Sequence, residues 1–125
     1  ESVFQPEEIE YIESQPIGRL ATSDPDGQPH VVPMAHRYNQ ILDTIDIGGY
    51  KFASSRSYQN VAANGRVAYV IDDIDSRSGP RGIEIRGRGE LQPDGGRELG
   101  PNFDEEMLRI YPEHIARWGI GSGND

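Results

Sequence analysis

The chain of 125 residues contains no cysteine, which excludes disulfide bonds, thiolate metal sites and cysteine nucleophiles. Basic residues are also scarce: 12 Lys and Arg stand against 21 Asp and Glu, for a formal net charge of -9 at pH 7. This charge argues against nucleic acid and anionic membranes as partners, because phosphate contacts need a basic surface. No apolar run approaches the ~20 residues of a membrane span, and no signal-peptide pattern opens the sequence. We therefore expect a soluble cytoplasmic protein.

Glycine and proline are abundant, with 15 Gly and 9 Pro. This composition favours short strands and tight turns over a helical bundle. The length predicts one domain covering residues 1–125. Several segments have the pattern of strands, while 5–14 has that of a short helix beginning at Pro6 and 54–65 that of a serine-capped helix. We expect a mainly β protein with small helices, in which mostly antiparallel strands form a small barrel. The expected strands are 17–23, 29–38, 44–49, 66–72, 81–92, 106–111 and 114–120.

Proline and glycine also mark where the strands are interrupted. Pro33 cannot donate a hydrogen bond to a sheet ladder, so the strand 29–38 should be an edge or be bulged at that point. Gly87 and Gly89 inside 81–92 indicate a bulge or the close approach of another backbone. The other expected interruptions are an exposed polar loop at 72–80, a linker at 93–102 and a turn at Pro112.

The three histidines do not have the pattern of a metal site. His30 and His36 lie on one face of the expected strand, and His114 is distant in the chain. No carboxylates accompany them at the spacing of known ligands. The order of Ser, His and Asp typical of nucleophilic catalysis is not visible either. We therefore predict no metal site and interpret the histidines as polar strand or turn residues.

The segment GGYKFASSRSYQN (48–60) has the residue types of an anion-binding site. Two glycines end a strand and let a ligand approach the backbone. Lys51, Arg56 and three serines then lie at or before the start of the expected helix. Backbone amides, hydroxyls and the helix dipole converge on anions at such positions. Serine capping beside a surface arginine is the alternative, and the sequence weighs the two about evenly. The serines are Ser54, Ser55 and Ser57.

The order of the motifs along the chain resembles that of one known family. The motifs are IGRLATSDPDGQPHVVPM, TIDIGG, SSRSYQNVAANGRVAYVIDD, RGIEIRGRGEL and ARWGI, and they extend from about Ile17 to Ile120. They are similar to those of the flavin-binding split β-barrel family that includes pyridoxamine 5′-phosphate oxidases. Within this family the chain resembles the actinobacterial deazaflavin-dependent oxidoreductases, which use coenzyme F420, and among these the group of the dehydrotetracycline reductases.

The resemblance implies a homodimer of six-stranded split barrels with two cofactor sites at the dimer interface. In this family the flavin or deazaflavin ring lies along the backbone of the second and third strands. The residues of this chain that match those positions are Val32, Pro33, Met34, Ile47, Gly48 and Gly49.

The family's phosphate site matches the segment that leads into the expected helix. Relatives often carry a lysine where this chain has Ser57, so one positive contact is lost or moved to Arg56. Trp118 matches a tryptophan common in this branch, which would line the site from the partner chain. Its alternative is packing in the core or an interface. The phosphate-site residues are Ser55, Arg56 and Ser57, followed by Gln59 and Asn60.

The activity implied by the resemblance is that of an oxidoreductase. It would use coenzyme F420 for hydride transfer to an activated C=C bond of a small organic molecule. The cofactor carries such a reaction and the protein supplies positioning and electrostatics, which explains the absence of a catalytic triad. Candidates for protonating the substrate are His36, Tyr38, Tyr58 and an ordered water. The alternatives are an FMN-dependent oxidoreductase on the same fold and a non-catalytic cofactor-binding protein.

Overall fold

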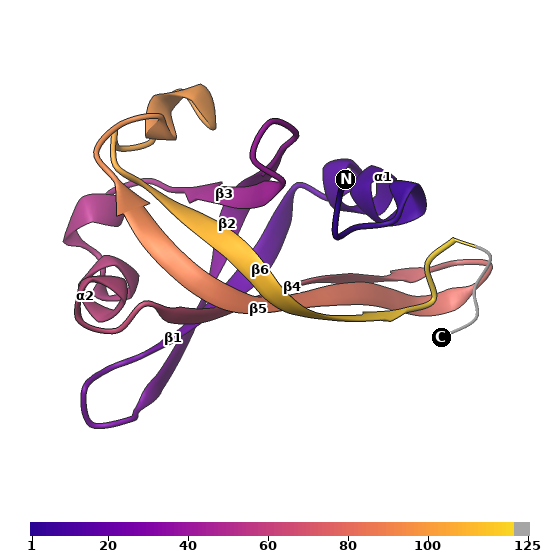
Figure 1. Cartoon of the computed structure of the whole chain (residues 1–125), viewed down its shortest axis with the longest axis horizontal. Coiled ribbons are helices and arrows are strands. Elements are labelled where there is room, and N and C mark those ends of the chain that lie inside the picture. Colours follow the sequence, from indigo (N-terminus) through magenta and orange to yellow (C-terminus); the bar gives the residue numbers. More distant parts are fainter. Residues whose placement is uncertain (122–125) are drawn as a thin grey trace.

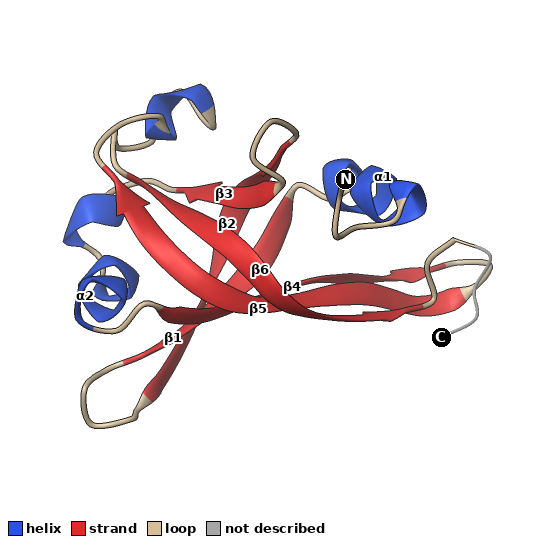
Figure 2. Ribbon diagram, in the orientation of Figure 1, coloured by secondary structure: helices blue, strands red, loops and turns tan. Residues whose placement is uncertain are grey.

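The computed structural model describes residues 1–121 of the chain. Six antiparallel strands close into a barrel in the order β1-β2-β3-β6-β5-β4. Short helices lie around it (Figure 2), and no helix in residues 1–121 is long and apolar enough to cross a membrane. The elements are α1 (Pro6–Ser14), β1 (Ile17–Ser23), β2 (Pro29–Asn39), β3 (Thr44–Gly48), η1 (Phe52–Ser54), α2 (Arg56–Ala63), β4 (Arg66–Asp75), β5 (Gly79–Gln92), η2 (Gly96–Glu98) and β6 (Met107–Trp118).

The prediction of a mainly β barrel with small helices is confirmed, and local sequence explains where the two helices begin. Pro6 occupies the first turn of α1, and Gln5 and Glu8 form a capping box around it. Ser55 caps α2, because its hydroxyl accepts a hydrogen bond from the Tyr58 backbone N–H at 3.1 Å. These caps satisfy backbone donors that the helices themselves leave unpaired.

The barrel interior holds one apolar core. Strands β1 and β3 to β6 contribute inward-facing side chains to it, and β2 packs the partly buried Met34 and Tyr38 against it. Ile12 of α1 is fully buried in the same cluster, so α1 packs onto the barrel. Burial of this apolar surface is the main force that holds the strands in register. The fully buried side chains of the barrel include Leu20, Ile45, Ile47, Tyr69, Ile71, Ile83, Ile85, Leu108 and Ile110.

The prediction of an exposed loop at 72–80 is wrong, because β4 and β5 continue through most of this segment. Their pairing runs from Arg66↔Arg88 to Asp75↔Gly79, and the hairpin extends with the end of β6 as an arm beside the barrel (Figure 1). Asp75 closes the turn by accepting backbone N–H groups with Oδ2. Solvent reaches much of the arm, so polar residues are tolerated there and obscure the strand pattern.

The two closing strands predicted around a turn at Pro112 are also wrong. A single strand, β6, runs through Pro112, so the barrel has six strands and not about seven. The register with β5 shifts between Arg86 and Gly87, opposite this proline. A Cβ at Gly87 would overlap the carbonyl oxygen of Tyr111, so glycine is required for this close approach. The expected close approach of another backbone at Gly87 is therefore confirmed, and the extra residue of the bulge, Glu113, lies on β6 next to the proline without ending the strand.

The prediction of an edge at Pro33 is confirmed. β2 pairs with β1 from Ile17↔Ala35 to Ser23↔Pro29, so the ladder on that side includes Pro33. On the other side, the ladder between β2 and β3 begins only at Ala35↔Gly48. The first half of β2 therefore has one unpaired edge, where a residue without an N–H costs no hydrogen bond.

Candidate functional site

An apolar pocket of about 380 Å³ opens beside the unpaired edge of β2, the end of β3 and the start of α2. Its volume lies within the range of small-molecule and cofactor sites. Most of its wall is aliphatic, aromatic or glycine. Seven of the residues that the sequence predicted for a cofactor site line it: Val32, Pro33, Met34, Gly48, Gly49, Ser55 and Ser57.

Glycines at the end of β3 make space beneath one side of this pocket. A Cβ at Gly48 would lie 2.9 Å from Leu99 Cδ1 and 3.2 Å from Phe103 Cδ2. A Cβ at Gly49 would lie 2.8 Å from the Met34 side chain. These glycines therefore admit side chains of the same chain against the backbone, and Met34 and Phe103 in turn line the pocket.

Ser57 supplies the polar group that stands out in this apolar surrounding. The residue is 1% exposed, and its Oγ has no hydrogen-bond partner among the described residues. A buried hydroxyl without a partner is costly, commonly by about 1–3 kcal/mol. Since Ser57 lines the pocket and lies in the first turn of α2, an unsatisfied hydroxyl lies directly behind the pocket wall at that position.

Charge at the start of α2 also favours an anion. The first residue of the helix, Arg56, is an exposed cation at the positive end of the helix dipole, and the first turn contains no acidic residue. By contrast, α1 has Glu7 and Glu8 in its first turn. Ser55 is engaged in capping, where its Oγ lies 2.7 Å from the Phe52 carbonyl oxygen. The groups at this helix start that attract an anion are therefore the unsatisfied Ser57 hydroxyl, the backbone amides and the Arg56 guanidinium, and Arg56 lies outside the pocket wall.

Five of the predicted residues do not line this pocket, and the exposed Arg56 at the start of α2 is one of them. Ile47 is fully buried in the barrel core, and Gln59 is exposed on α2. The Asn60 side chain donates a hydrogen bond to Thr22 Oγ1 at 3.0 Å, which joins α2 to β1. Trp118 ends β6 and lies against Gly82 of β5, in the arm.

His36 has both ring nitrogens engaged within the chain. Nε2 lies 2.9 Å from the carbonyl oxygen of Ile12, and Nδ1 lies 2.7 Å from the Tyr69 hydroxyl. A carbonyl oxygen can only accept, so Nε2 carries the hydrogen. Burial lowers the pKa of His36, against the opposing effect of backbone hydrogen bonds at Ile12 and Gln15. His36 is therefore a structural histidine of the α1–barrel contact and does not line the pocket.

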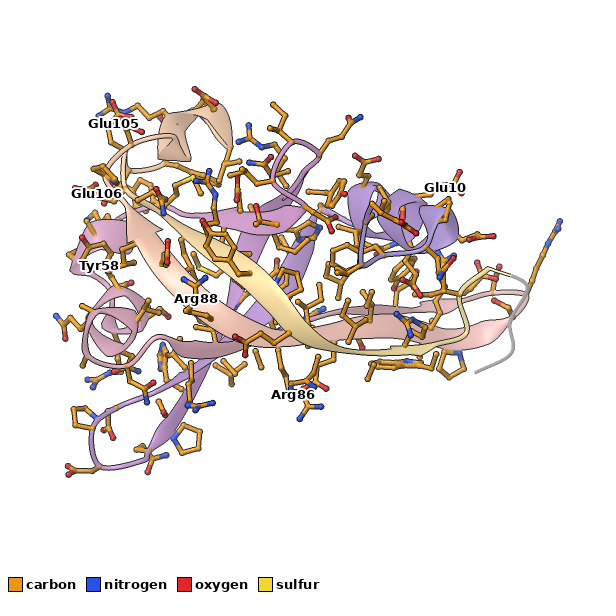
Figure 3. The ribbon with its side chains drawn as sticks, viewed as in Figure 1. Glu10, Tyr58, Arg86, Arg88, Glu105 and Glu106 are labelled. Carbon is orange, nitrogen blue, oxygen red and sulfur yellow. The ribbon has the colours of Figure 1, made fainter. Side chains whose placement is uncertain are left out.

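The two tyrosines suggested as proton donors also lie outside the pocket wall. The Tyr38 hydroxyl donates to Asp43 Oδ1 at 2.6 Å, and burial raises the pKa of Tyr38. Tyr58 lies on α2 (Figure 3) and packs edge-on against Phe52, with 5.4 Å between ring centroids. Phe52 itself lines the pocket, so Tyr58 supports the wall from α2.

Sequence reasoning missed several residues of the wall. Tyr50 and Phe52 lie in the segment already suspected of anion binding, where only the polar residues were considered. Phe103 directly follows the segment 93–102 that was predicted to be a linker, and it reaches the pocket only because this part of the chain folds back onto β3. His30 lines the pocket from the unpaired edge of β2. The alternation His30–Val32–Met34 on one strand face was the available signal for that residue.

A second depression, of about 460 Å³, lies over β1, β4, β5 and β6. Arg66, Arg86, Glu113 and His114 line it, so it is more polar than the pocket at β2. Arg86 on β5 (Figure 3) is 3.8 Å from the carboxylate of Glu84, which offsets its charge. This groove is larger, but among residues 1–121 it holds no buried side-chain polar atom without a partner, so the pocket at β2 is the stronger candidate site.

The closed six-stranded barrel, with its pocket between an unpaired strand edge and a helix start, defines a split β-barrel of the pyridoxamine 5′-phosphate oxidase type. Residues 4–118 match the family model described as pyridoxamine 5′-phosphate oxidase, and the chain belongs to this family.

Similar proteins agree with this assignment. The chain is 42% identical over 119 residues to the 5a,11a-dehydrotetracycline/5a,11a-dehydrooxytetracycline reductase of Streptomyces rimosus subsp. rimosus, covering 94% of this chain and 84% of that protein. Group A Streptococcus HupZ has a TM-score of 0.76 at 20% identity, covering 98% and 100% of the two chains. A structure described as an F420 reductase has a TM-score of 0.67 at 23% identity, covering 90% and 98%. The two structures support the fold alone.

Proposed function

We propose that this protein is an oxidoreductase that binds coenzyme F420 in the pocket at β2 and reduces an activated C=C bond of a small organic molecule. The observation that carries the proposal is the buried, unpartnered Ser57 hydroxyl at the start of α2, inside an otherwise apolar pocket. The 42% identity to a reductase supports the choice of reaction class.

The pocket fits the ring of a flavin-type cofactor. The unpaired edge of β2 offers backbone groups at Val32–Met34, and apolar side chains supply a dry surface for a flat aromatic system. Because Gly48 and Gly49 have no side chain, Phe103 and Met34 can pack directly against the backbone at the end of β3 and form the wall there. No carboxylate lines the pocket among the described residues, so an anionic ligand meets no like charge at the wall.

The start of α2 fits the phosphate of such a cofactor. Ser57 Oγ has an unused hydrogen, the helix dipole is positive at this end, and Arg56 adds a full charge. Oxyanion binding would satisfy the hydroxyl that is otherwise orphaned. Ser57 in place of the lysine frequent in relatives would leave Arg56 as the principal cation of the phosphate site.

When bound, the cofactor would supply hydride transfer, and the chain's residues would orient the reactants. Val32, Pro33 and Met34 would align the ring along β2, while Phe52 and Phe103 would exclude water from one side. Low local polarity strengthens the remaining electrostatic contacts. His30 and Tyr50 line the pocket and carry exchangeable protons, so we extend the list of candidate proton donors to these two residues.

The pocket opens to solvent, and we propose that a second copy of the chain completes it. In such a homodimer Trp118 of one protomer would approach the cofactor held by its partner. Exposed apolar side chains near the pocket, among them Ile17 at 42% and Tyr50 at 69% exposure, give that interface a hydrophobic component.

FMN is the second candidate cofactor, because it shares a flat ring system and a phosphate. A non-catalytic cofactor carrier is the third candidate function.

Fluorescence titrations with coenzyme F420 and with FMN separate the two candidate cofactors. Arg56→Ala should lower the affinity for the preferred cofactor about tenfold, roughly 1.4 kcal/mol. Arg77→Ala, in the distant arm, should leave this affinity unchanged. Binding no tighter than ~1 mM for both cofactors, about 4 kcal/mol, would contradict the proposal. Turnover of the reduced cofactor with a panel of enones separates an enzyme from a carrier.

A further inference from the structure

The segment 95–105 is a closed loop folded onto the barrel, although its sequence resembles a linker. Gly96 N–H donates to the carbonyl oxygen of Glu105 at 2.7 Å, which joins the two ends of the loop. Gly95 has a φ of +103°, and a Cβ at Gly96 would overlap the Asp104 carbonyl oxygen. Both glycines are therefore needed to close the loop. Figure 1 shows this segment beside the end of β3, at the same end of the molecule as α2.

Asp104 attaches the loop to two segments that border the pocket, the end of β3 and η1. Its backbone N–H donates to the Gly49 carbonyl oxygen at 3.1 Å, directly after β3. Its carboxylate Oδ2 accepts the Ala53 backbone N–H at 2.9 Å, within η1. Ala53 lies two residues before Ser55, the cap of α2. One residue thus fixes the loop relative to the end of β3 and to the start of α2.

Phe103 is the side chain that this attachment presents to the pocket. Its ring lies over Gly48, and a Cβ at Gly100 would approach the ring to 2.7 Å, so glycines border the ring on two sides. Phe103 N–H donates to the Gly100 carbonyl oxygen at 3.2 Å, which fixes the turn before it. Leu99 also contacts Gly48 but is not among the residues that line the pocket. Phe103 is therefore a positioned aromatic wall and not a loose surface side chain.

We propose that Phe103 is a specificity-determining residue that selects planar fused-ring ligands for this pocket, and that Asp104 is the positioning residue that holds it there. This inference rests on the proposed function, since it concerns the ligand of the same pocket. Phe103 supplies packing area to a flat ring without any polar group of its own. Phe103 should affect the binding of the ring and not of the phosphate, because the groups that would bind the phosphate lie at the start of α2.

Calorimetric titration of the full chain with four probes tests this assignment. The probes are coenzyme F420, FMN, lumichrome, which has a tricyclic ring but no phosphate, and inorganic phosphate, which has no ring. Phe103→Ala should weaken the binding of each ring ligand that wild type binds by tenfold or more, and leave phosphate affinity unchanged within twofold. Phe103→Leu, which keeps apolar volume but loses the flat face, should show the same ordering with a smaller loss. Leu99→Ala is the matched control and should change ring affinity less than threefold.

Asp104 is tested by substitution and rescue. Asp104→Ala removes the acceptor of the Ala53 N–H and should weaken ring ligands by fivefold or more. Asp104→Asn retains an oxygen acceptor and should restore ring affinity to within twofold of wild type. If wild type binds no ring ligand, both the proposed function and this inference are overturned. If wild type binds them and folded Phe103→Ala or Phe103→Leu binds equally well, only the inference is overturned. Equal loss in Asp104→Ala and Asp104→Asn would remove the positioning role.

Discussion

The hydroxyl of Tyr69 lies 2.7 Å from the backbone carbonyl oxygen of Met34, so a side chain from β4 crosses the barrel interior to support the strand that lines the pocket. The same hydroxyl lies 2.7 Å from Nδ1 of His36, two residues further along β2. Tyr69 is fully buried, and burial raises its pKa. The pocket edge of β2 is thus held from inside the barrel, on the portion of the strand that lacks β3 as a neighbour.

Tyr69→Phe should lower the free energy of unfolding by about 1–3 kcal/mol, because removing one partner leaves buried polar groups unpaired. Equilibrium urea unfolding measures this loss. Tyr50→Phe is the control, since Tyr50 is 69% exposed and should cost less than about 0.5 kcal/mol. If Tyr69→Phe were as stable as Tyr50→Phe, the bridge from β4 to β2 would have no energetic role.

Stability should fall when the pH drops from 7 to 5. Burial lowers the folded-state pKa of His36 from the ordinary value of 6.5, so the unfolded chain binds a proton at higher pH than the folded chain. The stabilisation that neutral His36 contributes is therefore fully present above about pH 6.5 and is lost as the pH falls towards the pKa of His36 in the folded state. Urea unfolding across this range should show a slope of up to about 1.4 kcal/mol per pH unit. The slope should decrease in His36→Gln but not in His114→Gln; an unchanged slope in His36→Gln would assign it elsewhere.

Asp46 is a fully buried carboxylate that joins three strands. Its oxygens accept hydrogen bonds from Arg109 at 3.0 and 3.3 Å, and from Asn39 at 3.0 Å. Burial alone would raise the pKa of Asp46, but these hydrogen bonds and the Arg109 charge outweigh it and lower the pKa. Its stabilisation is therefore present above the unfolded pKa and is lost as the pH falls through the folded one.

Asp46→Ala should lower the free energy of unfolding by about 3 kcal/mol, because it leaves Arg109 without its carboxylate in a half-buried position. Asp72→Ala provides the comparison, because Asp72 forms an exposed pair with Arg19 at 3.0 Å and should cost less than about 1 kcal/mol. Urea unfolding of the two variants at neutral pH makes the comparison. Equal losses would show that burial of Asp46 adds nothing to its contribution.

Ser57→Ala should separate stability from ligand binding. Without ligand, the variant removes a buried hydroxyl that has no partner, so its melting temperature should be equal to or higher than that of wild type. With a phosphorylated cofactor, its affinity should fall about tenfold, or roughly 1.4 kcal/mol. Ser54→Ala is the control, because Ser54 is exposed and donates to the Lys51 carbonyl oxygen. A Ser57→Ala protein with lower stability and full affinity would contradict the assignment of this hydroxyl to a ligand.

The sequence predicted the barrel where local chemistry is strong. Pro6 marked the start of α1 and the capping serines marked that of α2, and the missing N–H of Pro33 located the strand edge that borders the pocket. The sequence-based prediction failed where contacts between residues distant in the chain decide whether a segment forms a strand. The polar hairpin at 72–80 pairs because β4 and β5 are already in register, and β6 continues past Pro112 because Gly87 on β5 leaves room for the bulged backbone of β6.

The candidate site was predictable to a similar extent. The backbone positions on β2 and β3 and the serines of α2 converge on one pocket, as the motif order implied. Phe103 was not predictable, because its place depends on how the loop 95–105 attaches to Gly49 and Ala53. The orphaned state of Ser57 could not be read from the sequence either, since it depends on which neighbours leave its hydroxyl unpaired.

The location of the cofactor is the central claim, and a crystal structure of the protein with coenzyme F420 tests it most directly. We predict that the ring lies along the backbone of Val32–Met34 and that its phosphate lies within hydrogen-bond distance of Ser57 Oγ. A cofactor found instead in the groove between Arg66 and Arg86, with Ser57 Oγ still unpaired, would contradict the account.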